Sequence, residues 1–138
     1  MTLAEKQHAL VEELSLFDDA HDRLTVAVDR SKRVPPLPAA ERTEAHRVLG
    51  CVSTVWLVPE VRDGVCRFRA DAESPLVRGL VLLLTELFDG ATAAEIAGSD
   101  ADPLEALGLT RNLSPTRRNG LAAVRSAILA FARRHAGA

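Results

Sequence analysis

The chain has 138 residues with 17 Lys or Arg and 19 Asp or Glu, which gives a formal net charge of −2 at pH 7. This length fits one compact domain over residues 1–138, large enough to bury about two thirds of its unfolded surface. The charges are interspersed, without a basic block or an aromatic run suited to stacking on bases, so we expect no nucleic-acid partner. No segment approaches the roughly 20 apolar residues that span a bilayer, and the acidic N-terminus does not resemble a signal peptide. We therefore expect a cytoplasmic protein with no membrane partner.

Two helices are predicted before the first prolines. Apolar residues recur at helical spacing over 2–15, with acidic residues at other positions. Asp18 and Asp19 suit the start of a second helix that continues to about residue 32, because acids there cap free N–H groups and complement the helix dipole. The proline-rich stretch 35–38 keeps the helix from continuing. The paired acids are therefore interpreted as helix caps rather than as a metal or acid–base site.

A small sheet is predicted in the middle of the chain. Residues 44–49 are ambiguous between a short helix and a strand, and we favour a strand. Residues 52–61 are rich in β-branched side chains, with apolar residues on both faces of the strand, so we expect one face to meet helices and the other to meet a loop or a partner. Residues 65–70 alternate in polarity. Asp63-Gly64 between them is typical of a two-residue hairpin turn. We expect an α+β fold with a small antiparallel three-stranded sheet packed on one side by several α-helices.

Helices are predicted again after the sheet. The run 75–88 is almost wholly apolar and should be the buried spine against the sheet. Short helices are predicted from 92 and over 102–108, and a final helix over about 115–135. Arg117 lies in the first turn of that last helix, where a cation opposes the helix dipole. Its charge is therefore expected to serve a specific contact, with a solvated arginine as the alternative.

The two cysteines are expected to be independent of each other. They lack the spacing of a disulfide framework or of a four-thiolate metal site. A turn at 63–64 would place Val61 opposite Cys66, and Cys51 lies about 33 Å further back along an extended strand. A disulfide needs Cα atoms within about 7 Å. Cys66 falls on the apolar face of its strand and is predicted to be in the core.

The stretch around Cys51 carries the candidate chemistry. Gly50 can adopt backbone angles that other residues avoid, so the chain can bend there and hold Cys51 on a loop tip. The thiolate is the nucleophile, with a free pKa near 8.5 that nearby cations lower, and Arg47 is four residues away. The alternative is a cysteine used as a small hydrophobe beside Val52 and Val55. From composition alone, that alternative is favoured.

Other chemistry has little support in the sequence. It contains no P-loop, dinucleotide fingerprint, HExxH or Gly-x-Ser-x-Gly motif. His46 is weighed as a base for Cys51, but a surface histidine is the favoured interpretation. An iron–sulfur scaffold would need several thiolates at one site, whereas a lone thiol suits a carrier.

Gly50-Cys51, Ser53 and Val55-Trp56, followed by Leu113-Ser114-Pro115-Thr116-Arg117 and Gly120-Leu121, closely resemble the SufE family of sulfur-acceptor proteins. The resemblance covers most of the chain, from the proline-rich stretch to the final helix. It implies that Cys51 occupies the place of the family's cysteine in a Gly-Cys-Gln-Ser motif. Val52 stands where the family usually has Gln. The family's matching arginine lies near the cysteine loop, so Gly50, Ser53 and Arg117 are expected to support the site.

The resemblance also implies a function. Cys51 would take persulfide sulfur from a cysteine desulfurase and relay it to an iron–sulfur scaffold, stimulating the desulfurase. Pyridoxal phosphate would belong to that partner, and no cofactor is expected here. Such a protein is a carrier and activator rather than an enzyme with its own small-molecule substrate. The alternative is a non-catalytic module that binds and activates a desulfurase through the loop around Val52 and Trp56 without carrying sulfur.

Overall fold

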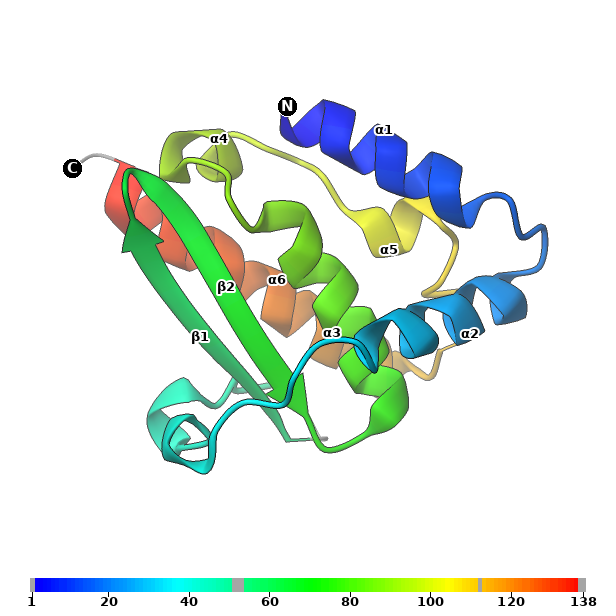
Figure 1. Ribbon diagram of the computed structural model, residues 1–138, viewed down its shortest axis with the longest axis horizontal. Coiled ribbons are helices and arrows are strands. Elements are labelled where there is room, and N and C mark those ends of the chain that lie inside the picture. The colour runs from blue at the N-terminus through cyan, green and yellow to red at the C-terminus, as the bar shows by residue number, and fades with distance from the viewer. Residues whose placement is uncertain (1, 51–53, 112, 137–138) are drawn as a thin grey trace.

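The structure is a computed structural model that describes residues 2–50, 54–111 and 113–136. A two-stranded hairpin stands at one side of the molecule, with helices α3 and α6 behind and beside it (Figure 1). The elements follow in the order α1 (Leu3–Leu14), α2 (Ala20–Ser31), η1 (Ala39–Glu41), η2 (Glu44–His46), β1 (Val55–Arg62), β2 (Val65–Ala72), α3 (Pro75–Phe88), α4 (Ala93–Ala97), α5 (Pro103–Ala106) and α6 (Pro115–Ala136).

The hairpin has the predicted turn and register. β1 and β2 pair antiparallel, and Val61 lies opposite Cys66. Asp63 and Gly64 have φ values of 53° and 82°. Two successive positive φ angles give a turn whose twist matches that of paired strands, and Asp-Gly is a favoured sequence for it.

The predicted third strand over 44–49 is wrong. Residues Glu44–His46 form a 3₁₀ turn, in which the His46 N–H donates to the Thr43 carbonyl at 3.1 Å. Only Arg47 bridges to Trp56 of β1 in the antiparallel sense. Main-chain groups that bond locally within 3₁₀ turns are not available to a neighbouring strand, so the described sheet has two strands.

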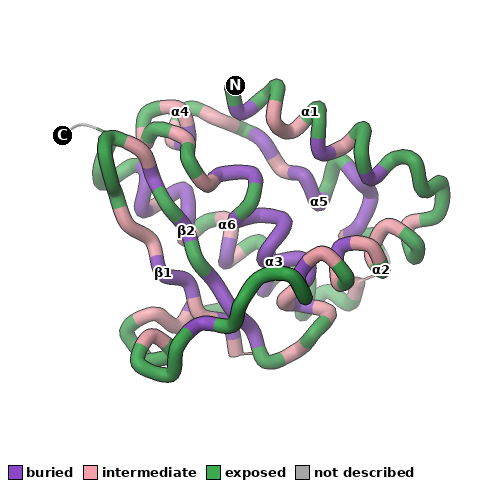
Figure 2. The backbone as a smooth tube through the Cα atoms, in the orientation of Figure 1, coloured by how far each residue is buried: buried purple, intermediate pink, exposed green. Residues whose placement is uncertain are grey.

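The core lies between the hairpin and the helices. Cys66, Phe68 and Ala70 of β2 are buried, as their alternation predicted. Helix α3 is the predicted spine, and Figure 2 shows buried residues along much of its length. Its buried residues are Val77, Gly79, Leu80, Val81, Leu82, Leu83, Leu84, Thr85, Leu87 and Phe88. α2 packs on α3, and α4 packs on α6.

The other face of the hairpin is covered by the segment before it. Val58 is buried on that face and Leu37 of the proline-rich connector (residues 33–38) is buried as well, and neither belongs to the main core cluster. The prediction that the apolar second face of the strand meets a loop is consistent with this arrangement. The connector and the two 3₁₀ turns thus occupy the side of the sheet that the helices leave free (Figure 1).

The predicted helix caps are present. Asp19 accepts from the His21 N–H at 2.9 Å, and Ser74 accepts from the Val77 N–H at 3.4 Å. These bonds satisfy amide groups that the first helical turn leaves without partners. In the part of the chain that the structure describes, no helix is both long and apolar enough to cross a bilayer.

Candidate functional site

The predicted cysteine loop begins at a residue packed against α6. Gly50 has a φ of 94°, and a Cβ built on it would lie 3.2 Å from the Cβ of Ala123. Gly50 therefore supplies both a left-handed backbone conformation and a close approach to the helix. Cys51, Val52 and Ser53 lie outside the described residues. Beyond them, the Thr54 carbonyl accepts from the Glu73 N–H at 3.1 Å, which holds the start of β1 against the end of β2.

The residues before Gly50 are also anchored. Val48 is buried, and its N–H donates to the Val55 carbonyl at 2.9 Å. Leu49, between Val48 and Gly50, has 82% of its surface exposed. An exposed leucine held between two fixed residues is available to a partner without rearrangement of the backbone.

Trp56, a predicted partner-binding residue, is partly buried at the start of β1. The Arg42 guanidinium carbon lies 5.5 Å from the centroid of its ring, a cation–π arrangement. The Arg42 Nη2 also donates to the Asp71 Oδ2 at 2.7 Å. Because Trp56 and Asp71 are partners in the strand register, Arg42 spans the two strands at this point.

Asp71 is the centre of a buried polar cluster that sequence reasoning missed. Its residue exposure is 2%, and its carboxylate accepts from the Arg78 Nε at 2.7 Å, the Ala72 N–H at 2.9 Å and the Leu37 N–H at 3.0 Å as well as from Arg42. Burial by itself raises the pKa of Asp71, but these hydrogen bonds outweigh it and hold the pKa below the ordinary 3.8. An ionised Asp71 thus joins the connector to β2 and α3.

Arg78 extends this cluster to the end of α2. It donates to the main-chain carbonyls of Ser31 and Val34, the latter at 2.9 Å. An acid in an otherwise apolar part of a strand, followed seven residues later by an arginine on a buried helix, is the sequence signal that could have identified the pair. Buried carboxylates require such partners.

Arg117 is exposed in the first turn of α6, and its own N–H donates to the Ser114 Oγ at 3.2 Å. Within residues 2–50, 54–111 and 113–136, its guanidinium has no ion pair or hydrogen bond. Ala123, which meets Gly50, lies six residues later, about 9 Å along the helix axis. The start of α6 and the cysteine loop therefore approach one another, while contact between Arg117 and Cys51 remains a prediction.

The other candidate residues are not part of the loop. Cys66 is fully buried, and burial raises the pKa of its thiol. The His46 Nδ1 lies 2.8 Å from the Glu41 carbonyl and supports the 3₁₀ turns. Among the described residues, no group of three or more His, Cys, Asp or Glu side chains could hold a metal ion.

Comparison with known proteins gives consistent matches. The sequence model of the family described as "SufE: Fe-S metabolism associated domain" matches residues 8–132. An uncharacterized SufE-like protein of Rhizobium meliloti is 33% identical over 117 residues, covering 81% of this chain and 84% of the relative. An uncharacterized SufE-like protein of Synechocystis is 33% identical over 119 residues, covering 86% and 75%.

Two further matches differ in kind. A chloroplastic quinolinate synthase of rice is 40% identical over 100 residues, which is 72% of this chain but 14% of that protein. The solution structure of a hypothetical protein from Thermus thermophilus superposes with a TM-score of 0.77 at 22% identity, covering 96% of this chain and 97% of the other. At 22% identity, this structural similarity supports the same fold and does not by itself indicate a shared function.

Proposed function

The chain belongs to the SufE family of Fe-S metabolism associated domains, and we propose that within it Cys51 accepts sulfur from a cysteine desulfurase and passes it to an iron–sulfur scaffold. The observation that carries the proposal is the position of Gly50, which brings the loop to α6 and leaves Leu49 exposed next to the cysteine. A reactive thiol must be reachable by its partner.

The transfer is a displacement at sulfur. The Cys51 thiolate attacks the terminal sulfur of the desulfurase's cysteine persulfide, a new S–S bond forms to Cys51, and the enzyme's S–S bond breaks. The desulfurase cysteine leaves as a thiolate. The transferred sulfur keeps its proton and becomes the terminal sulfur of the Cys51 persulfide. Atoms and electrons balance without an external oxidant or reductant.

Arg117 is proposed to stabilise the attacking thiolate. A cation near a thiol favours the charged form and lowers its pKa, and the free amides at the start of a helix act in the same direction. The absence of a described partner for the guanidinium supports this role, since a committed ion pair would compete with it. Trp56 and Val52 are proposed to contact the desulfurase beside the cysteine.

The Cys51→Ser variant tests the proposal. It should bind the desulfurase with unchanged affinity, take no ³⁵S label from it and fail to stimulate it, because serine cannot form a persulfide. Full stimulation of the desulfurase by the variant would instead identify a non-catalytic activator. Cys66 is a suitable internal control, since a buried thiol should take no label in either protein.

Arg117→Ala tests the supporting site. Alkylation of the native protein as a function of pH should report Cys51, because Cys66 is buried. The variant should titrate at a higher pH than wild type and accept sulfur more slowly, while the free energy of unfolding changes by no more than about 0.5 kcal/mol. Arg118→Ala is the matched control. If both variants titrate as wild type does, Arg117 has no role at the site.

A further inference from the structure

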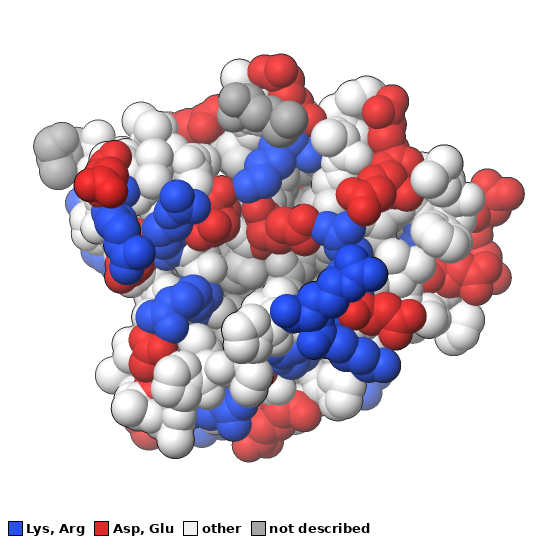
Figure 3. All heavy atoms as spheres, in the orientation of Figure 1, with Lys and Arg blue, Asp and Glu red and all other residues white. Residues whose placement is uncertain are grey.

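Two adjacent residues of opposite charge fasten the segment before the cysteine loop to β2. Glu41 accepts from both terminal nitrogens of Arg69, and Arg42 donates to Asp71. Because Arg69 and Asp71 are two residues apart on the strand, their side chains lie on the same face of the hairpin. Figure 3 shows basic and acidic side chains next to one another over the hairpin. The two pairs together hold residues 41–42 at one position on that face.

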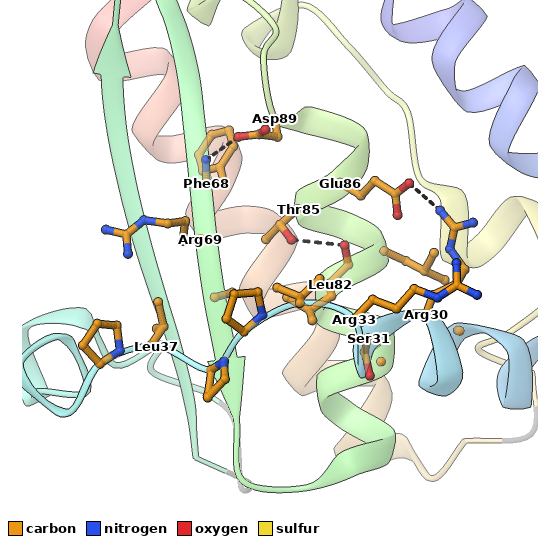
Figure 4. Close-up of a pocket in the computed structure, with 18 residues that line it drawn as sticks. Arg30, Ser31, Arg33, Leu37, Phe68, Arg69, Leu82, Thr85, Glu86 and Asp89 are labelled. Carbon is orange, nitrogen blue, oxygen red and sulfur yellow. Dashed lines mark hydrogen bonds and ion pairs between the residues drawn. The ribbon is translucent and has the colours of Figure 1, made fainter.

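This arrangement is separate from the groove between β2, α3 and the end of α2. The groove has a volume of about 660 Å³ (Figure 4). Figure 4 shows the Arg69 side chain directed away from the α2 wall of the groove. Arg42 and Trp56 are not among the described residues that line it. Their contact therefore belongs to the outer face of the hairpin.

Arg42 lies over the side chain of Trp56. Its guanidinium carbon is 5.5 Å from the centroid of the ring, and a cation within about 6 Å of an aromatic face is attracted to it. The same guanidinium donates to Asp71 at 2.7 Å, and Asp71 is 2% exposed. Asp71 is held in turn by the Arg78 Nε at 2.7 Å. The position of the ring is thus tied, through Arg42, to a carboxylate in the interior.

The main chain around Trp56 is fixed independently of this contact. The Thr54 carbonyl accepts from the Glu73 N–H at 3.1 Å, and the Val55 carbonyl accepts from the Val48 N–H at 2.9 Å. A fixed backbone still leaves a side chain its choice of staggered rotamers. Trp56 is partly exposed at the end of the cysteine loop, so the guanidinium contact bears on which part of the ring a partner meets.

We propose that Arg42 is a positioning residue for desulfurase binding: held by Asp71, its guanidinium keeps the Trp56 indole in the orientation that contacts the desulfurase. The inference rests on the proposed function for the identity of the partner. A side chain that is already ordered loses less conformational entropy when a complex forms. Loss of Arg42 therefore weakens binding and leaves the chemistry at Cys51 unchanged.

Tryptophan fluorescence tests the contact without a partner, because Trp56 is the only tryptophan in the sequence. In Arg42→Ala, quenching by acrylamide should rise about twofold, since the ring loses the guanidinium that covers it. Arg62→Ala removes an equal charge from an exposed pair with Glu60 and should be quenched as wild type is. Equal quenching of wild type and Arg42→Ala would overturn the proposal.

Circular dichroism establishes that the variants are folded. In Arg42→Ala, Asp71 keeps the Arg78 Nε and the N–H groups of Leu37 and Ala72 as donors, so the carboxylate is not left unpaired. Arg42→Gln, which retains a donor for Asp71 but places no charge over the ring, takes its place if Arg42→Ala does not fold.

Stimulation of the desulfurase, measured against the concentration of this protein, separates binding from chemistry. Arg42→Ala should raise the half-saturating concentration about fivefold and leave the maximal rate unchanged. In a Trp56→Ala background the same change should have an effect of less than about twofold, because the side chain that Arg42 positions is absent. An unchanged half-saturating concentration or a lowered maximal rate would overturn the proposal. Equal effects in the two backgrounds would also overturn it, in favour of a direct contact between Arg42 and the desulfurase.

Failure of the proposed function has a different signature. Wild-type protein that neither takes ³⁵S label from the desulfurase nor stimulates it would overturn the proposed function and, with it, the role of Arg42 in desulfurase binding. Normal labelling and stimulation by wild type, with failure of either Arg42 test, would overturn the positioning role alone.

Discussion

The two outer edges of the β-hairpin are completed in different ways. At the β1 edge, Val48 bonds to Val55 and the chain then passes through Gly50, packed on Ala123, into the cysteine loop. At the β2 edge, the carboxylates of Asp71 and Asp89 accept from the outward N–H groups of Ala72 and Phe68, where a neighbouring strand would otherwise supply carbonyls. The β1 edge thus positions a loop, while the β2 edge holds a groove.

The difference follows from what each neighbouring segment can donate. The N–H of Val48, directly after the 3₁₀ turn, donates to the Val55 carbonyl, and a single bridge forms beside it between Arg47 and Trp56. The connector contains three prolines between residues 35 and 38 and is held through Leu37 and a side-chain carboxylate. Each edge can therefore be disturbed separately.

The largest effect is expected at Asp71. Asp71→Asn leaves Arg78 and Arg42 without their buried anion and should lower the free energy of unfolding by about 3 kcal/mol. Urea denaturation followed by circular dichroism measures this loss. Glu60→Gln, which breaks a solvent-exposed pair with Arg62, is the control and should change stability by less than about 1 kcal/mol. Equal losses would mean that the Asp71 cluster does not hold the connector.

The same cluster predicts a pH dependence. The pKa of Asp71 is lower in the folded protein than the ordinary 3.8, so its ionised form stabilises the fold fully above that value. The stability difference between wild type and Asp71→Asn should persist at neutral pH and shrink as the pH falls through the lowered pKa. A difference that stays constant down to about pH 2 would show that ionisation of Asp71 contributes nothing.

An intermediate effect is expected at Gly50. An alanine there must adopt a φ of 94° and displace Ala123, whereas Gly64→Ala meets a φ of 82° with no atom within 4 Å. We expect losses of about 2 and 1 kcal/mol in the free energy of unfolding, respectively. Sulfur acceptance, measured with ³⁵S, should fall only in Gly50→Ala. Equal sulfur acceptance by the two variants would show that the packing of Gly50 against α6 is not needed for sulfur transfer.

The smallest effect is expected at Leu49. Leu49 and Leu16 are both 82% exposed, but Leu16 lies between α1 and α2, away from the cysteine loop (Figure 1). Replacing either by Ser should change the free energy of unfolding by no more than about 0.5 kcal/mol. Only Leu49→Ser should weaken binding to the desulfurase, by about fivefold, since part of a leucine side chain would no longer be buried in the complex. If calorimetry gives the same affinity for the desulfurase with both variants, Leu49 is not part of the interface.

Much of the fold could be predicted from the chemistry of residues that are close together in the sequence. The caps at Asp19 and Ser74, the Asp63-Gly64 turn and the burial of Cys66 all depend on neighbours within a few residues, and the structure confirms them. The motif residues around Cys51 and Arg117 likewise indicated the family, which the match over residues 8–132 shows.

Tertiary structure decided what local patterns left open. Residues 44–49 have no strong periodicity, so the sequence did not decide between a 3₁₀ turn and a strand. In the structure, residues 44–46 form a 3₁₀ turn supported by the contact of His46 with Glu41, and Arg47 makes a single bridge to Trp56. The role of Asp71 depends on Arg78, seven residues away, together with donors from Arg42 and Leu37, 29 and 34 residues away, which a local window does not contain. The approach of Gly50 to Ala123 has the same origin, because it arises from how distant segments pack rather than from the residues beside them.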